Sequence, residues 1–99
     1  MPAVDKSLLE RWRTLPAEVV LRGLADSAKP DPTYRPLKGL SSLRWHVAFG
    51  QREFELLTTG PKFWDTRAQV GGGGAVDLAM HLAGASFKDA VSLLIERGL

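Results

Sequence analysis

Residues 63–82 set the architecture of this 99-residue chain and read Phe63-Trp64-Asp65-Thr66-Arg67-Ala68-Gln69-Val70-Gly71-Gly72-Gly73-Gly74-Ala75-Val76-Asp77-Leu78-Ala79-Met80-His81-Leu82. Their order predicts a short aromatic strand over residues 62–65, a glycine-rich turn, and an amphipathic helix from about Ala75 to Leu82. Gly84 ends that helix, and Ser86 is the expected N-cap of a last helix from Phe87 to Arg97. The C-terminal third is therefore one strand followed by two helices.

Two further strands precede this segment. In residues 43–49, apolar and polar side chains alternate with the period of two that is typical of a half-buried strand. Gly50-Gln51 predicts a tight hairpin turn, and residues 52–58 return as the second strand. Thr59-Gly60-Pro61 turns the chain again into the strand at 62–65. The sequence thus predicts a three-stranded antiparallel meander.

The N-terminal part has helical patterns. Residues 5–13 place Leu8, Leu9 and Trp12 on one apolar stripe, and Pro16 is the expected first-turn residue of a second helix, Ala17 to Ala25.

A break follows the two helices. The prolines in residues 26–32 disfavour helix, and residues 34–39 are predicted to run extended over the surface. The expected fold is α+β, with one domain over residues 1–99. Residues 1–28 form its helical N-terminal part, and residues 40–99 form the three-stranded sheet with two C-terminal helices.

Composition narrows the class of protein. A hydrophobic content of 44% and a charged content of 24% are typical of a soluble globular domain. No apolar run reaches the roughly 18–20 residues of a transmembrane helix, and Met1-Pro2-Ala3-Val4-Asp5-Lys6 lacks the layout of a signal peptide. We therefore expect a cytoplasmic protein. The absence of cysteine excludes disulfides and thiolate metal sites.

The sequence gives little support for catalysis or for a bound cofactor. The glycines at 71–74 are consecutive, and no Gly-Lys-Ser/Thr follows them, so neither nucleotide-binding fingerprint is present. His46 and His81 fall on different elements without metal-ligand spacing, and His81 is expected at the surface or at a helix end. Asp77 fits a first-turn carboxylate that complements the helix dipole better than it fits a catalytic group. We expect no enzyme activity, no metal and no cofactor.

Basic and aromatic residues are interleaved along the predicted strands. Residues 29–52 contain five basic residues and one acidic residue, which gives this segment a net charge of +4. The net charge of the rest of the chain is −2. Such a segment can follow phosphates while exposed aromatic rings stack on unpaired bases. Strand alternation predicts that Trp45 is buried and that Trp64 is exposed. The candidate nucleic-acid-binding residues are Arg44, His46, Arg52, Lys62, Trp64 and Arg67.

The strand, turn and helix at 63–82, together with Gly84-Ala85-Ser86-Phe87-Lys88-Asp89-Ala90-Val91, resemble the zinc-ribbon domain of bacterial DnaG-type primases and of primase-like proteins of plasmids and mobile elements. The resemblance covers roughly residues 40–94. It places Thr66 and Gln69 where the family has its second pair of zinc ligands, and no Cys or His falls near the first pair, at 49–52. The chain resembles a zinc ribbon that has lost its metal, in which the glycine run either replaces the metal-organised knuckle or forms a flexible turn.

The resemblance implies a non-catalytic module that binds single-stranded DNA beside a primase, polymerase or helicase in the replication of a mobile element. An alternative remains open. The domain could instead dock on such a replication protein through its sheet or through Leu8, Leu9 and Trp12, without touching DNA.

Overall fold

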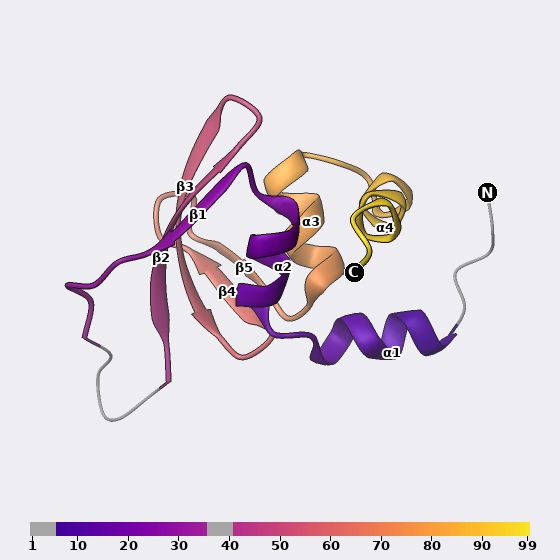
Figure 1. Cartoon of the computed structure of the whole chain (residues 1–99), viewed down its shortest axis with the longest axis horizontal. Coiled ribbons are helices and arrows are strands. Elements are labelled where there is room, and N and C mark those ends of the chain that lie inside the picture. The colour runs from indigo at the N-terminus through magenta and orange to yellow at the C-terminus, as the bar shows by residue number, and fades with distance from the viewer. Residues whose placement is uncertain (1–5, 36–40) are drawn as a thin grey trace.

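A computed structural model describes residues 6–35 and 41–99 as one sheet and four helices (Figure 1). The strands are β1 (Ser27–Pro30), β2 (Leu43–Phe49), β3 (Arg52–Thr59), β4 (Lys62–Asp65) and β5 (Val70–Gly72). They lie in the order β1-β2-β3-β4-β5, and each pair is antiparallel. The helices are α1 (Lys6–Thr14), α2 (Ala17–Leu24), α3 (Ala75–Ala83) and α4 (Phe87–Glu96).

The α+β class is confirmed, but the predicted number of strands is wrong, because the sheet has five strands instead of three. Residues 26–32, predicted as a break, contain β1. Its Pro30 is tolerated because β1 is an edge strand. In such a strand the N–H groups on the outer side have no neighbouring strand to pair with, so a residue without an N–H fits there. The glycine run contributes β5, in which Gly71 and Gly72 pair with β4. Of the extended segment predicted over residues 34–39, positions 36–39 lie outside the described residues.

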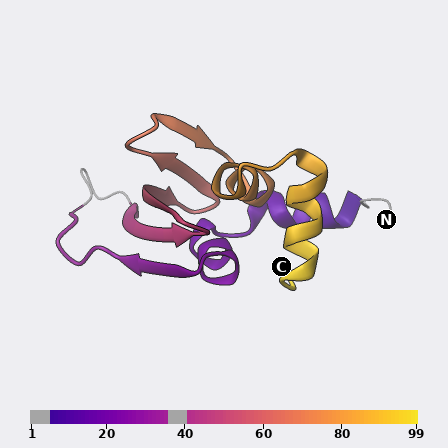
Figure 2. The same ribbon diagram turned by 90° about the horizontal axis from the view of Figure 1, so that it is seen from above.

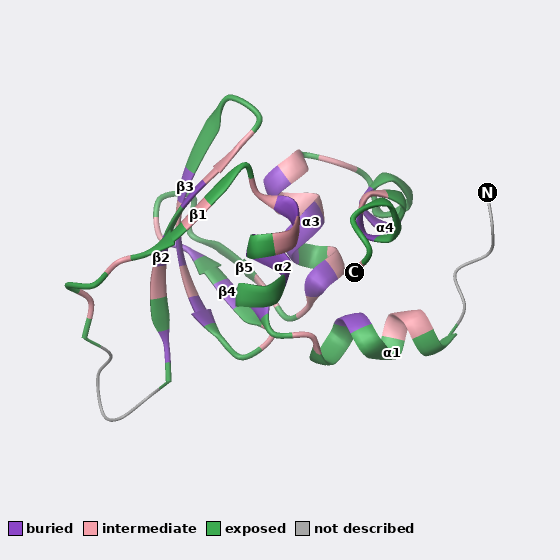
Figure 3. Ribbon diagram, viewed as in Figure 1, coloured by how far each residue is buried: buried purple, intermediate pink, exposed green. Residues whose placement is uncertain are grey.

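The helices gather on one side of the sheet, and the core lies between the two layers (Figures 1 and 2). Alternate residues of β2, β3 and β4 point into it, so that burial follows the period of two along each strand (Figure 3). Trp45 is fully buried, as predicted, and its indole N–H donates to the Thr58 hydroxyl at 3.0 Å. That bond satisfies the polar atom of the largest buried side chain in the sheet.

The predicted helices are present, with ends that shift by one residue at most among the described positions. Gly84 ends α3 in the left-handed conformation, and the Ser86 side chain caps α4 by accepting from the Asp89 N–H. Among residues 6–35 and 41–99 no single helix is long and apolar enough to cross a membrane. The bent pair of α3 and α4 would suffice by length and composition only.

The sheet surface opposite the helices is called the open face here. Its residues on β2, β3 and β4 are Arg44, His46, Ala48, Glu53, Glu55, Leu57, Thr59, Lys62 and Trp64. The register places Leu57 between Arg44 on one neighbouring strand and Trp64 on the other. Residues of three strands thus meet in one row across the open face.

Candidate nucleic-acid interface

Five of the six predicted binding residues lie at the open face. Arg44, His46, Lys62 and Trp64 belong to its strands, and Arg67 reaches it from the turn between β4 and β5, with its Nε 4.0 Å from Glu55 Oε2. The alternation of side chains along β2 and β4 explains why these residues share a side of the sheet.

Arg52 does not join them. It has the same parity along β3 as the buried Phe54, so it points to the helix-covered side of the sheet. Its guanidinium carbon lies 4.8 Å from the centre of the Phe54 ring, and a side chain at Gly84 would meet it. A nucleic acid on the open face would therefore not reach Arg52, and the structure separates it from the other five candidates.

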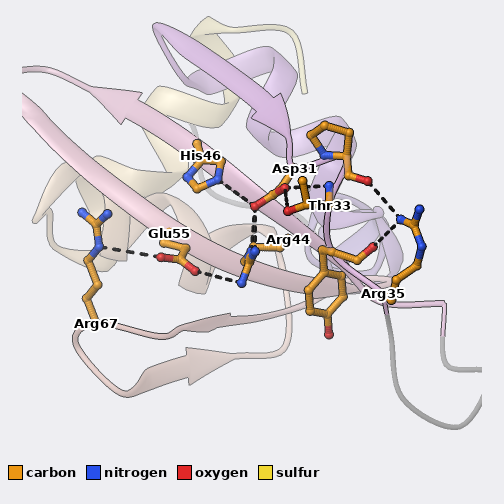
Figure 4. Close-up of polar contacts among 9 residues, drawn as sticks. Asp31, Thr33, Arg35, Arg44, His46, Glu55 and Arg67 are labelled. Carbon is orange, nitrogen blue, oxygen red and sulfur yellow. Dashed lines mark hydrogen bonds and ion pairs between the residues drawn. The ribbon is translucent and has the colours of Figure 1, made fainter.

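A carboxylate in the turn after β1 organises Arg44 and His46 on the open face (Figure 4). Asp31 Oδ2 accepts hydrogen bonds from Arg44 Nε at 3.0 Å and Arg44 Nη2 at 2.8 Å, and it lies 3.1 Å from His46 Nε2. Glu55 lies on the other side of Arg44, with Oε1 3.6 Å from Nη1. Arg44 is thus fixed in direction by one carboxylate and loosely paired with a second.

A shallow recess of about 220 Å³ lies beside this network. Its polar lining includes Lys29, His46, Glu53 and Arg67. The register accounts for the grouping, because Lys29 is opposite His46 on the neighbouring strand. The recess therefore brings cationic and imidazole groups together with one carboxylate beside Arg44.

Trp64 is the large exposed aromatic side chain of the open face, at 44% exposure, as the alternation predicts. Its ring lies over Gly71 of the adjacent strand. A Cβ at Gly71 would stand 2.8 Å from Trp64 Cε3 and 2.7 Å from the Phe63 carbonyl oxygen. Glycine at position 71 therefore lets the indole lie across β5 in place of standing away from the sheet.

The remaining glycines of the run differ in how closely other atoms approach them. A Cβ at Gly72 would stand 2.7 Å from Asp77 Cβ and 2.7 Å from Phe63 Cε1, so this glycine lets β5 pass directly beside α3. Gly74 is the N-cap position of α3 and lies against α1, whereas a Cβ at Gly73 would meet nothing within 4 Å. The run is thus partly a strand and partly a helix start, and its glycines have unequal roles.

Asp65 and His81 form a largely buried pair between β4 and α3. His81 lies in the last turn of α3, as one of the two expectations for it had it, but its side chain is turned against the sheet and is not a surface group. His81 Nε2 lies 2.6 Å from Asp65 Oδ2, and only 5% of the Asp65 side chain is exposed. The imidazole lies against the rings of Phe54 and Phe63, at 5.5 and 5.6 Å between centroids. This pair ties the third helix to the sheet through a polar contact inside an apolar wall.

The second oxygen of Asp65 organises the turn between β4 and β5. Oδ1 accepts hydrogen bonds from the backbone N–H groups of Arg67 and Ala68, both at 2.9 Å. Gln69 then adopts a φ of 56°, the left-handed conformation that turns the chain back into β5. One carboxylate thus holds the turn in which the resemblance places Thr66 and Gln69 as substitutes for metal ligands.

The residues of this turn do not fit a structural zinc ion. Thr66 and Gln69 offer a hydroxyl and an amide instead of thiolate or imidazole ligands, and the Thr66 hydroxyl donates to the Glu55 carbonyl at 3.3 Å. Within the described ranges, no three His, Cys, Asp or Glu side chains come together as metal ligands. Asp65 and His81 provide the contacts that hold the turn and the helix in this structure.

Hydrogen bonding lowers the pKa of both organising carboxyls. The Thr33 hydroxyl and N–H, then His46 and Arg44, hold the pKa of Asp31 well below its usual range. Burial by itself would raise the pKa of Asp65, but the Ala68 N–H, His81 and the Arg67 N–H together outweigh burial and lower it. Both side chains are therefore ionised in the folded protein at neutral pH.

These lowered pKa values predict how stability depends on pH. A carboxyl with a lower pKa in the folded state stabilises the fold fully above its unfolded pKa of about 4, and this contribution is lost as pH falls toward the folded pKa. We expect the contribution of these two groups to be constant from pH 7 to 5 and to fall below about pH 4. Urea unfolding at several pH values measures this. The double variant Asp31→Asn/Asp65→Asn should lose less stability on acidification than the wild type, and an equal loss would contradict the assignment.

Three residues of the site were not found from the sequence, namely Asp31, Asp65 and Tyr34. For the two aspartates, a signal was present in the local sequence. Asp31-Pro32-Thr33 and Asp65-Thr66-Arg67 both begin turns with an aspartate, a residue that accepts from the N–H two positions on. Tyr34 carried no signal, because its place beside Arg44 depends on how the first of these turns folds.

Comparison with known proteins gives one match. The chain is 45% identical to a protein of Zymomonas mobilis subsp. mobilis named "65 kDa protein", over an alignment of 109 residues that covers 97% of this chain and 18% of that protein. No protein-family model and no solved structure matches the chain. This chain therefore spans less than a fifth of the length of a relative whose name states a mass and no activity.

Proposed function

We propose that this domain is a non-catalytic module that binds single-stranded DNA on its open face during DNA replication or priming, in the manner of a primase zinc ribbon without its metal. The observation that supports it best is the Trp64 ring laid over Gly71 in the same row as Arg44. A flat, exposed aromatic ring beside cationic groups suits unpaired bases, because every base has a face that can stack. The setting expected from the resemblance is a plasmid or another mobile element.

Part of the positive charge on the open face is already paired with carboxylates. This favours stacking of bases over a purely electrostatic contact. Arg44 is held by Asp31 and Glu55, and Arg67 is 61% exposed with only a 4.0 Å approach to Glu55. No salt bridge joins Lys62 to any residue that the structure describes. Lys62 and Arg67 are therefore the residues best placed to contact phosphates, while Arg44 is preorganised by acids.

The test is the fluorescence anisotropy of labelled single-stranded and duplex oligonucleotides at two salt concentrations. We expect the single strand to bind more tightly and Trp64→Ala to weaken binding roughly 5- to 100-fold, as for the loss of one stacked base. Ile95→Ala is the matched control, because Ile95 is also 44% exposed but lies on α4. Absence of binding by the wild type at low salt would refute the proposed function.

The charged contact is tested in the same way. Lys62→Gln should weaken binding and reduce the steepness of the salt dependence by about 0.7 in the plot of log affinity against log salt, as for one lost phosphate contact on a single strand. Lys88→Gln, which removes an exposed lysine from the first turn of α4, should leave that slope unchanged. Equal effects of the two changes would argue against a defined phosphate contact at Lys62.

A second candidate is docking on a replication protein such as a primase, polymerase or helicase. An open, mostly apolar recess of about 380 Å³ between α1, α3 and the start of α4 favours it, and its lining includes Leu9, Val76 and the half-exposed Phe87. Trp12, predicted as a docking residue, is only 1% exposed and belongs mainly to the core. Under this alternative, Leu9→Asp abolishes capture of the partner in a pull-down, while Trp64→Ala has no effect.

A further inference from the structure

The segment that follows β1 makes a tight turn beside Arg44 and His46 of the open face. The Asp31 N–H donates to the Arg44 carbonyl at 2.7 Å, which extends the pairing of β1 with β2 by one step. Asp31 Oδ1 then accepts from the Thr33 N–H at 2.8 Å and the Thr33 hydroxyl at 2.6 Å, and the Tyr34 N–H donates to the Asp31 carbonyl at 3.3 Å. Pro32 favours such a turn because its ring fixes φ at the second position.

The turn brings an aromatic ring to the Arg44 guanidinium. Arg44 Cζ lies 5.3 Å from the centre of the Tyr34 ring, while Asp31 holds Arg44 through both Nε and Nη2. A guanidinium with two of its nitrogens bonded to one carboxylate oxygen is restricted in orientation, and its plane can stack on a nucleobase as an aromatic ring does. The guanidinium is therefore held over the Tyr34 ring, and the two groups from different elements form one pair.

Arg44 of this pair shares a row of the sheet with Trp64. Arg44 and Trp64 are both opposite Leu57 in the sheet, so two inter-strand spacings, roughly 10 Å, separate their backbones. Stacked nucleotides advance about 3.4 Å each along one strand. A strand that stacks on both places must therefore supply about four nucleotides, and fewer if it is extended between them.

We propose that Tyr34 and Arg44 form a second stacking platform for an unpaired DNA base, and that Asp31 is the positioning residue that holds Arg44 in it. The proposal rests on the proposed single-stranded DNA binding and adds to it a second base position at the β1 side of the open face. The occupant is a single DNA strand, since the basic side chains Lys29, Lys62 and Arg67 border the two platforms with charge complementary to phosphates.

The test compares the dissociation constants of oligothymidylates of two, four, six and eight nucleotides for the wild type and for variants at residue 34. Wild-type affinity should rise between two and about four nucleotides and change less beyond that length. Tyr34→Ala should weaken binding of the longer oligonucleotides roughly 5- to 100-fold and remove much of that rise. Tyr34→Phe keeps the ring and should restore near wild-type binding. An unchanged dissociation constant for Tyr34→Ala would overturn the proposal.

Two substitutions distinguish an effect of Asp31 on the position of Arg44 from an effect of its negative charge. If only charge matters, Asp31→Asn and Glu53→Gln each remove one negative charge from the DNA-binding side and should both tighten binding. If Asp31 positions Arg44, Asp31→Asn should weaken binding while Glu53→Gln tightens it. Glu53 is a fair match because it is exposed on the same face and makes no salt bridge with a described residue. Tightening by both changes would overturn the positioning role.

Arg44→Lys completes the design, because lysine keeps the charge and loses the plane. Weaker binding by this variant supports the platform, and unchanged binding contradicts it. The outcome also distinguishes the two proposals. If the wild type binds no oligonucleotide, both fail. If Trp64→Ala weakens binding while the changes at Tyr34, Asp31 and Arg44 do not, the proposed function stands and the second platform is refuted.

Discussion

Replacing Asp65 with alanine is expected to lower the free energy of unfolding by about 2–4 kcal/mol, because a nearly buried carboxylate that accepts several hydrogen bonds is lost and their donors are left unpaired. The change leaves His81 without its partner inside an apolar wall of Phe54 and Phe63. It also leaves the N–H groups of Arg67 and Ala68 without their acceptor. Urea unfolding of the whole chain measures the loss.

Two further variants sharpen this prediction. Asp65→Asn keeps an acceptor oxygen for the turn and should cost less, roughly 1–2 kcal/mol, since one charge-assisted hydrogen bond is weakened. Asp89→Ala removes an exposed carboxylate from the first turn of α4 and should cost about 1 kcal/mol or less. If Asp65→Ala costs no more than Asp89→Ala, the Asp65–His81 pair does not hold the helix to the sheet.

Gly72→Ala is expected to destabilise the fold by about 1–3 kcal/mol, whereas Gly73→Ala next to it should be neutral or stabilising by up to about 1 kcal/mol. The added methyl group at position 72 would overlap Asp77 Cβ and Phe63 Cε1, both 2.7 Å away, and neither can move without shifting α3 or the core. At position 73 the methyl group meets nothing within 4 Å.

The pair of glycine variants also tests how the run works. If the four glycines were only a flexible turn, the two substitutions would have similar small effects. A large difference between neighbouring positions instead indicates close packing of β5 against α3. Thermal or urea unfolding of both variants under the same conditions decides between these outcomes, and equal stabilities would refute the packing account.

The periodic strands were predictable because a strand with one buried face must alternate. β2 and β3 show that pattern over seven and eight residues, and their predicted bounds are nearly those observed. β1 and β5 lack this alternation, each for a different reason. The prolines around β1 suggest a break, although an edge strand tolerates Pro30, and the glycines of β5 have no side chains to alternate. Pairing with a neighbour, which local sequence does not reveal, makes both into strands.

The candidate site was predictable where the alternation of side chains along a strand determines it. Parity along the strand placed Arg44 with His46 and exposed Trp64, and the same rule applied to Arg52 places it with Phe54 on the covered side. The Asp65–His81 pair joins residues 16 positions apart on a strand and a helix. Such a contact depends on how α3 packs on the sheet, and no spacing within either element indicates it.

The unequal burial of the three tryptophans makes the chain its own fluorescent reporter. Trp12 and Trp45 are almost entirely shielded from solvent, and Trp64 is 44% exposed over Gly71. A collisional quencher such as acrylamide or iodide therefore reaches one indole of the three in the folded domain. Emission that remains after quenching reports the packing of the interior, and the quenched fraction reports whatever covers the sheet surface. The same unlabelled sample can thus follow unfolding and surface occupancy as two separate signals.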